Sequence, residues 1–122
     1  MPVLSKESIL SVSDLKTERV AVPEWGDGAE VLVTELSGSA MDRLNAENYM
    51  VDDKGKATFN REGFLIRTVA VCLVDEEGNC LFSAEEAAEL GKKSGKVLNR
   101  IFDAANRLNG FTASAQKDVE KN

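Results

Sequence analysis

The chain has 122 residues, which is enough for one hydrophobic core but too few for two domains of ordinary size. Hydrophobic residues make up 43% and charged residues 30%, as in globular proteins, and no apolar run reaches the ~18 residues that a membrane-spanning helix needs. The net charge of -6 argues against binding to nucleic acid, which relies on clustered Lys and Arg, so we expect a soluble protein that binds neither nucleic acid nor membrane.

Residues 1–15 are predicted to form an arm of the domain rather than part of its compact body. They contain no basic segment followed by a long apolar one, so we expect no secretory signal. Serines and charges mix with scattered Ile and Leu, and although Ser13 and Asp14 are residue types that cap helices, the periodicity is too weak to define one. We expect this arm to be loosely ordered.

Two β-rich segments follow, at residues 18–24 and 29–36. Both favour β-branched residues in the way that pleated strands do. Between them, residues 25–28 supply two glycines that adopt positive φ at little cost, so the whole segment predicts a β-hairpin. Pro23 has no N–H to donate to a ladder, which places the first strand at a sheet edge or at a bulge.

A helix is expected after the hairpin. Ser37 and Ser39, with Asp42 three residues after Ser39, resemble an N-terminal cap. The helix should end near Val51, because residues 52–56 form a polar turn cluster. Its inner face is predicted to carry Ala40, Met41, Leu44 and Tyr49.

Residues 64–74 form the most apolar stretch of the chain, interrupted only by Arg67 and Thr68. Periodicity cannot distinguish a buried helix from a buried strand in such a run. The length favours a helix and the β-branching favours a strand. We predict a helix, capped by Asn60.

Residues 75–79 then form a polar turn, and residues 80–82 a short extended piece. Ser83 and Glu86 fit the capping-box pattern Ser-x-x-Glu, so a short helix should begin there and stop at Gly91.

The clearest helix begins after Ser94. Asn109-Gly110 is a suitable C-terminal stop, with Phe111 placed to fold back on the last turn. One apolar stripe is formed by Val97, Leu98, Ile101, Phe102, Ala105 and Leu108.

The predicted fold class is therefore α+β, with an N-terminal β-hairpin or small antiparallel sheet packed against about four helices. We expect a single domain at residues 1–112, with mobile termini. The polar residues 113–122 should form a disordered tail.

The sequence offers no catalytic constellation. It contains no histidine, the commonest general base and the usual zinc ligand. Cys72 and Cys80 lack the partners that a tetrahedral zinc site needs, and in a reducing cytoplasm we expect no disulfide between them. The acidic clusters at residues 52–53 and 75–77 lie in polar turns that offer nothing to raise a carboxyl pKa. We expect no enzyme activity, cofactor or metal.

Two segments imitate ligand-binding loops. Residues 91–97 resemble a phosphate loop, but the second glycine comes one residue early and Val97 stands where Ser or Thr must reach magnesium. Residues 75–86 resemble a calcium loop, but Cys80 stands where glycine is needed for the sharp bend. We interpret the first as a basic turn between helices, and the second as a hairpin turn followed by a helix cap.

Several short segments, in this order, are similar to one protein family. The longest reads RTVAVCLVDEEGNCLFS, at residues 67–83. The others are residues 14–18, 22–26, 36–39, 90–94 and 107–110. They are spread from residue 14 to residue 110, so the resemblance extends over nearly the whole chain. The family that they resemble is that of the tail assembly chaperones of long-tailed phages and prophages.

The resemblance implies a small non-enzymatic protein in the cytoplasm of the bacterial host. Such a protein self-associates and coats the long helical tape measure protein, keeping its apolar surface covered until tail tube subunits replace the chaperone. It would be absent from the mature virion. The alternative is a structural tail or head-tail joining protein that stays in the virion, and binding of a small ligand or calcium at residues 75–86 is a third hypothesis.

Two further expectations concern the C-terminal half. The candidate partner contacts are Val97, Ile101 and Leu108, although such a stripe is more often core than interface, by roughly three to one. The family resemblance also implies a programmed frameshift near the end of the gene. Codons for residues 120–122 can spell the slippery heptamer A AAA AAC, which would give a minority of longer products.

Overall fold

A three-stranded antiparallel sheet forms one side of the fold in this computed structural model, which describes residues 3–111. The strands are β1 (Thr17–Ala21), β2 (Glu30–Thr34) and β5 (Leu73–Val74), in the order β1-β2-β5. β1 and β2 pair from Thr17 opposite Thr34 to Ala21 opposite Glu30, which confirms the predicted hairpin. Their connection contains the 3-10 helix η1 (Pro23–Trp25), so Pro23 lies beyond the strand, and β1 is an edge strand as predicted.

Helix α2 (Gly38–Asn48) begins as predicted but ends early. The Ser37 hydroxyl accepts a hydrogen bond from the Ala40 N–H, so Ser37 rather than Ser39 is the cap. Leu44 is buried, and Ala40 and Met41 pack against the core.

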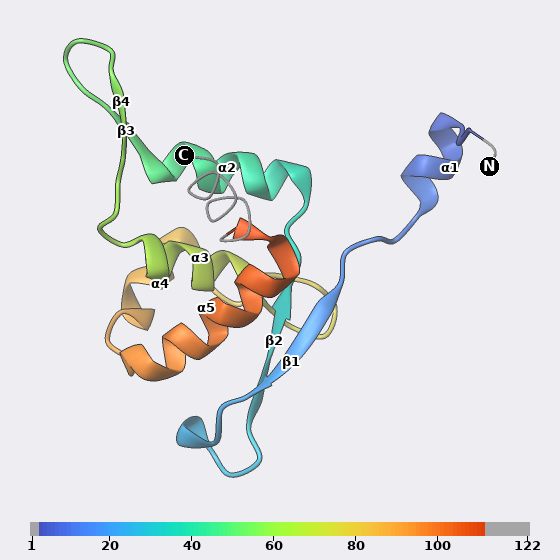
Figure 1. Cartoon of the computed structure of the whole chain (residues 1–122). Helices are drawn as coiled ribbons and strands as arrows, with labels where there is room; N and C mark the ends of the chain where they lie inside the picture. Colours follow the sequence, from blue (N-terminus) through green and yellow to red (C-terminus); the bar gives the residue numbers. More distant parts are fainter. Residues whose placement is uncertain (1–2, 112–122) are drawn as a thin grey trace, which may run out of the picture.

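A second hairpin follows α2 where the sequence predicted more helix. Its strands β3 (Tyr49–Val51) and β4 (Ala57–Phe59) pair antiparallel. Asp52 shapes the turn, because its Oδ1 accepts hydrogen bonds from the N–H groups of Lys54 and Lys56. The predictions that Tyr49 lies in the helix and that the helix ends near Val51 are therefore wrong. Figure 1 shows this hairpin projecting from the body of the protein.

Helix α3 (Phe64–Cys72) confirms the helical prediction for most of the apolar stretch. Leu73 and Val74 leave the helix and pair with β2 as strand β5, so the prediction was wrong for these two residues. The N-cap is Gly63, whose φ of 80° is left-handed, and not Asn60 as predicted. Asn60 lies at the base of the second hairpin instead, where its N–H donates a hydrogen bond to the Asn48 carbonyl at 2.6 Å.

The last two helices match the predictions. Ser83 and Glu86 form the capping box that starts α4 (Ala84–Leu90), and Ser94 caps α5 (Gly95–Asn109). Gly110 ends α5 in the left-handed conformation, and Phe111 packs against the core. Residues 113–122 lie outside the described part of the chain.

The core lies between α5, α3 and the sheet. α5 packs against α3, β1 and β2, while α3 also contacts α2 and α4. The completely or almost completely buried side chains include Val22, Val33, Val69, Cys72, Leu73, Val97, Leu98 and Ile101. Within residues 3–111, no helix combines the length and the apolar character needed to cross a membrane.

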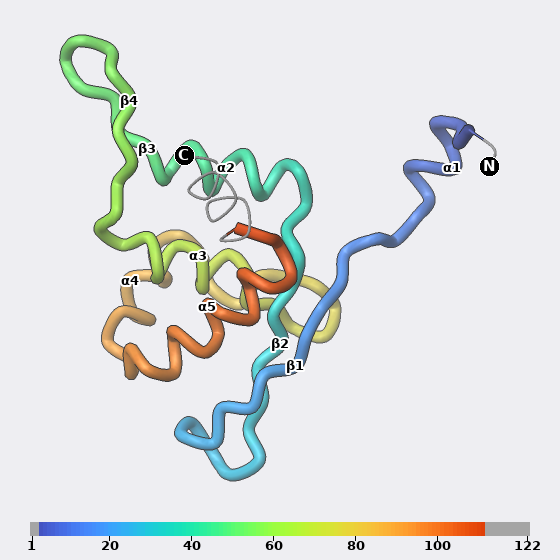
Figure 2. Tube along the Cα trace, in the orientation of Figure 1, coloured from blue at the N-terminus to red at the C-terminus, as the bar shows by residue number. Residues whose placement is uncertain are grey.

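Ahead of β1, the chain forms a short helix that the sequence did not predict, α1 (Lys6–Ser11). Ser5 caps it, and Ser13 and Asp14 lie in the extended connection to β1 rather than at a helix start. Every residue from 3 to 17 is exposed. In Figures 1 and 2, α1 stands clear of the rest of the molecule.

Candidate interaction surfaces

The β3–β4 hairpin is anchored at its base by Arg67 of α3. The Arg67 Nε donates to Asn48 Oδ1 at 2.9 Å, and Nη2 donates to the Asn60 carbonyl at 2.7 Å. Asn48 and Asn60 are the residues that immediately flank the two strands, and a third bond joins Nη1 to the Glu62 carbonyl. A single side chain therefore holds both legs of the hairpin against the body.

We expect Arg67→Met to loosen this hairpin without unfolding the domain. Three hydrogen bonds from a charged donor would be lost, and the buried Asn48 amide would lose its partner, at a cost of about 1–3 kcal/mol. Hydrogen exchange of the amides of residues 49–59 should become faster. Arg61→Met is the matched control, because Arg61 is exposed and no ion pair or hydrogen bond of its side chain is found in residues 3–111. Equal exchange in both variants would contradict the anchoring role.

A chain of four aromatic rings links the hairpin to the core. Tyr49 meets Phe59 edge to face with ring centroids 5.6 Å apart, Phe59 meets Phe64 at 5.2 Å, and Phe64 meets Phe102 of α5 at 5.6 Å. Edge-to-face pairs at these distances are favourable beyond their apolar burial. The hairpin is thus fixed by packing as well as by Arg67.

One side of the hairpin is apolar and open to solvent. Residues directly opposite in an antiparallel pair lie on the same side, so the pairs Tyr49–Phe59 and Val51–Ala57 share one side and the pair Met50–Thr58 the other. We call the first side, formed by Tyr49, Val51, Ala57 and Phe59, the hairpin face. Tyr49 is 52% exposed and Val51 is 70% exposed. Apolar side chains exposed together in this way are typical of a protein-binding surface.

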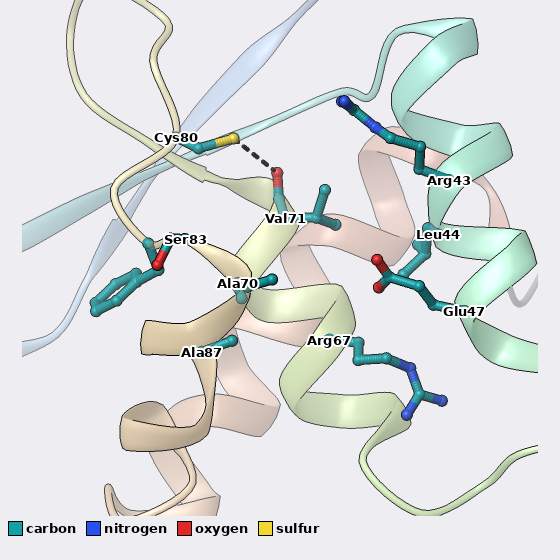
Figure 3. A pocket seen from close by; sticks show the side chains of 11 residues that line it. Arg43, Leu44, Glu47, Arg67, Ala70, Val71, Cys80, Ser83 and Ala87 are labelled. Atoms are coloured by element: carbon teal, nitrogen blue, oxygen red, sulfur yellow. Dashed lines mark hydrogen bonds between the residues drawn. The ribbon is translucent and has the colours of Figure 1, made fainter.

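A pocket of about 530 Å³ lies between α2, α3 and α4. Figure 3 shows Leu44 on α2 facing Ala70 and Val71 on α3, with Ala87 of α4 on the opposite wall. Arg43 and Glu47 stand at the α2 rim, and Arg67 of α3 adds a third charged side chain to the lining. The remaining lining residues are Cys80, Phe82, Ser83 and Ala84. Apolar side chains and charged side chains of both signs line the pocket, a combination typical of sites that bind a ligand with an apolar part.

The three predicted partner-contact residues lie on α5 in or beside the core. Val97 is 1% exposed and Ile101 is 0% exposed, and Leu108 is half-buried against the same core. A partner would reach Val97 and Ile101 only if α5 moved, so their role in binding stays a prediction. Tyr49, Val51 and Phe59 were not among the partner contacts predicted from the sequence. The pattern that pointed to a hairpin there is the set of aromatic and β-branched residues on either side of the polar turn at residues 52–56.

The two ligand-like loops act as turns. Asp75 Oδ1 accepts hydrogen bonds from the N–H groups of Glu77 and Asn79, each at 2.9 Å. Backbone hydrogen bonds, first from Asn79, lower the pKa of Asp75, so its carboxylate is already satisfied. Residues 91–94 join α4 to α5, where the Ser94 hydroxyl accepts from the Val97 N–H. Within residues 3–111, no group of three His, Cys, Asp or Glu side chains is arranged to hold a metal.

The buried Cys72 thiol is not set up as a nucleophile. Burial raises the pKa of the Cys72 thiol to about 12, so it stays protonated. Cys80 is exposed at the pocket, and its Sγ lies 3.9 Å from the Val71 carbonyl oxygen. Both thiols are free.

Two ion pairs and one amide hold α5 onto strand β1, the β1–β2 connection and the segment after β2. Arg100 binds both Glu24 carboxylate oxygens, at 2.8 and 2.6 Å, and Arg107 binds Glu18 at 2.7 Å. The Asn109 amide accepts from the Leu36 N–H at 2.8 Å and donates to the Ala105 carbonyl. These contacts fix the rigid body from which the arm and the hairpin project.

We expect the Glu24–Arg100 pair to contribute stability only above acidic pH. The hydrogen bonds from Arg100 lower the pKa of Glu24 from 4.5 to about 2. A carboxyl with a depressed pKa contributes fully above its ordinary value, and the contribution is lost as the pH falls from 4.5 towards 2. The melting temperature of Glu24→Gln should therefore lie below that of the native protein at pH 7 and approach it at pH 2 to 3.

The expected difference is small and should shrink in high salt, because the pair is exposed. Glu47→Gln is the matched control, since no ion pair of Glu47 is found in residues 3–111. A gap between Glu24→Gln and the native protein that stays constant from pH 7 to 2 would contradict the assignment.

Comparison with known proteins agrees with this architecture. The family model described as "Phage tail assembly chaperone" matches residues 6–122. The solved structure of the bacteriophage HK97 tail assembly chaperone is 28% identical, covers 77% of this chain and 85% of its own, and superposes with a TM-score of 0.53. No curated protein matches the sequence. The chain therefore belongs to the phage tail assembly chaperone family, as its sequence pattern and its α+β fold both indicate.

Proposed function

We propose that this protein binds the tape measure protein of a phage tail and keeps it in solution while the tail is assembled in the host cytoplasm. The observation that carries the proposal is the hairpin face, where Tyr49 and Val51 lie exposed on a hairpin held rigidly by Arg67. Family membership supports the role in tail assembly.

The hairpin face suits an apolar helical partner. Tyrosine and other aromatic residues often dominate the binding energy of protein interfaces. Because Arg67 and the aromatic chain already hold the face in place, binding would order few additional groups. A long apolar helix could therefore be covered by many copies of the protein, each contributing one hairpin.

The surface turns and the pocket support binding rather than catalysis. Asp75 and Asp52 are used by backbone N–H groups in turns, and the pocket between α2 and α4 has an apolar floor. We propose a non-enzymatic protein without a cofactor. Release of the tape measure protein to tail tube subunits would then require only competition for the same apolar surface.

We also propose that the protein self-associates, as its family resemblance implies. We also keep the proposed partner contacts of Val97, Ile101 and Leu108. The side chains of Val97 and Ile101 are buried, so a partner would contact them only after α5 has moved. A longer product from frameshifting at the codons for residues 120–122 is a further proposal, which sequencing of the gene and its downstream frame would test.

Co-expression with the neighbouring tape measure gene, followed by pulldown, tests the proposed function. We expect the tape measure protein to co-purify with the native chain. Failure to co-purify, together with this chain being found by mass spectrometry in purified virions, would favour the alternative of a structural tail or head-tail joining protein.

A further inference from the structure

The arm, residues 3–15, carries apolar side chains that its own domain leaves uncovered. Isolated helices shorter than about 12–15 residues are marginal in water, and α1 has six residues. Such a helix becomes stable when its apolar side is packed against something. The side chains that lack such cover are Val3, Leu4, Ile9, Leu10, Val12 and Leu15, with exposed fractions from 47% to 98%.

The pocket between α2, α3 and α4 has the complementary character. Its floor includes Leu44, Ala70 and Val71, and its volume of about 530 Å³ is large enough for apolar side chains from a docked helix. On the α2 rim, Arg43 and Glu47 are separated by one helical turn.

The charges of the arm match this rim. α1 contains Lys6 and Glu7, one charge of each sign, as the rim does with Glu47 and Arg43. No ion pair of any of these four side chains is found in residues 3–111. Docking of α1 through the side that carries Glu7 and Leu10, three residues apart, would allow Glu7 to pair with Arg43.

The direction of the arm favours the pocket of another molecule. Lys16 is held to Glu35 by two hydrogen bonds, from the Lys16 N–H to Glu35 Oε1 at 3.0 Å and from the Glu35 N–H to the Lys16 carbonyl at 2.8 Å. The second of these bonds joins the two backbones and continues the β1–β2 pairing by one residue, so the chain reaches β1 along the strand direction. Figures 1 and 2 show α1 on the side away from α3 and α4.

We propose that the arm of one copy docks in the α2–α3–α4 pocket of a second copy, with Ile9 and Leu10 entering the pocket and Glu7 meeting Arg43. This inference rests on the self-association proposed above and names the surfaces that produce it. Each copy has one arm and one pocket, so the exchange is either reciprocal within a pair or continues from copy to copy.

Cys80 provides a native reporter of this contact, because it is exposed and lines the pocket. In the full chain, Leu10→Cys should form a disulfide between two copies under a mild oxidant, visible as a dimer on a non-reducing gel. The bond should disappear when Cys80→Ser is added. Val51→Cys is the matched control, since Val51 is 70% exposed and Leu10 is 77% exposed.

Charge reversal gives a second test that needs no cross-link. Sedimentation equilibrium should show weaker self-association for Glu7→Arg and for Arg43→Glu, by about tenfold each, and recovery in the double variant. Both sites are exposed, so circular dichroism should show that each variant folds.

The possible outcomes separate the two proposals. A monomer at all concentrations would overturn both self-association and arm exchange. Oligomers that persist while Leu10→Cys cross-links no better than Val51→Cys would overturn arm exchange alone. A Leu10→Cys disulfide with Cys80 inside one chain would show that the arm folds back on its own pocket, which also overturns the exchange.

Discussion

Replacing Ile101 by Ala is expected to lower the free energy of unfolding by about 2–5 kcal/mol. Ile101 is 0% exposed, in the middle of the α5 stripe that packs on α3 and the sheet. The substitution removes buried methyl groups and leaves a cavity that close-packed neighbours fill only in part. For a domain of this size the loss is a large fraction of the total stability. Urea unfolding followed by the helical circular dichroism signal measures it.

Val51→Ala is the control for the Ile101 variant, because Val51 is apolar and β-branched but lies exposed on the hairpin. Its effect should stay within about 0.5 kcal/mol. If the two substitutions changed stability equally, the α5 stripe would not be core, and Val97, Ile101 and Leu108 would again become candidates for a surface that binds the partner.

The double variant Tyr49→Thr/Val51→Thr is expected to bind tape measure fragments at least about tenfold more weakly than the native protein. Interface anchors of this kind each contribute more than about 1 kcal/mol, and 1.4 kcal/mol corresponds to a factor of ten. Threonine is a β-branched residue that suits a strand, and it replaces the aromatic ring of Tyr49 and one methyl group of Val51 by a hydroxyl group. Fluorescence anisotropy with a labelled fragment measures the change.

Met50→Thr is the matched control for this double variant. Met50 lies on the same strand and is 57% exposed, but its side chain is on the opposite side of the hairpin. Its affinity should remain within a factor of about two of the native value. Equal weakening in Met50→Thr and in the double variant would show that the hairpin face is not the specific contact.

Signals within a few residues of each other accounted for much of the fold. Ser83 and Glu86 specified the start of α4, the glycines at 26 and 28 specified the first hairpin, and the stripe from Val97 to Leu108 specified α5. Each of these depends on local backbone chemistry or on a period that the sequence repeats several times. Local patterns of that kind can be recognised without knowledge of the tertiary contacts.

The hairpin face could not be predicted in the same way. Strands of three residues such as β3 are too short to show an alternating pattern, and Tyr49 continues the helical spacing of α2. What ends α2 is a set of contacts with distant residues. Arg67 binds Asn48 across 19 positions, and Tyr49 packs against Phe59 on the other strand of the hairpin.

The same limitation applies to the core and the arm. The sequence indicated that Val97 and Ile101 share one side of a helix. Whether that side is buried or contacts a partner depends on the elements that pack against it. In the structure these elements are α3 and the sheet. The arm contains a capped helix that its own sequence periodicity did not reveal, because six residues are fewer than two helical turns.

The most direct test of the proposed function is the fraction of full-length tape measure protein that stays in the supernatant after centrifugation. We expect the native chain and Met50→Thr to keep it in solution, and Tyr49→Thr/Val51→Thr to let it precipitate although the variant itself remains folded. If the tape measure protein precipitated equally with and without the native chain, the proposed chaperone function would be wrong.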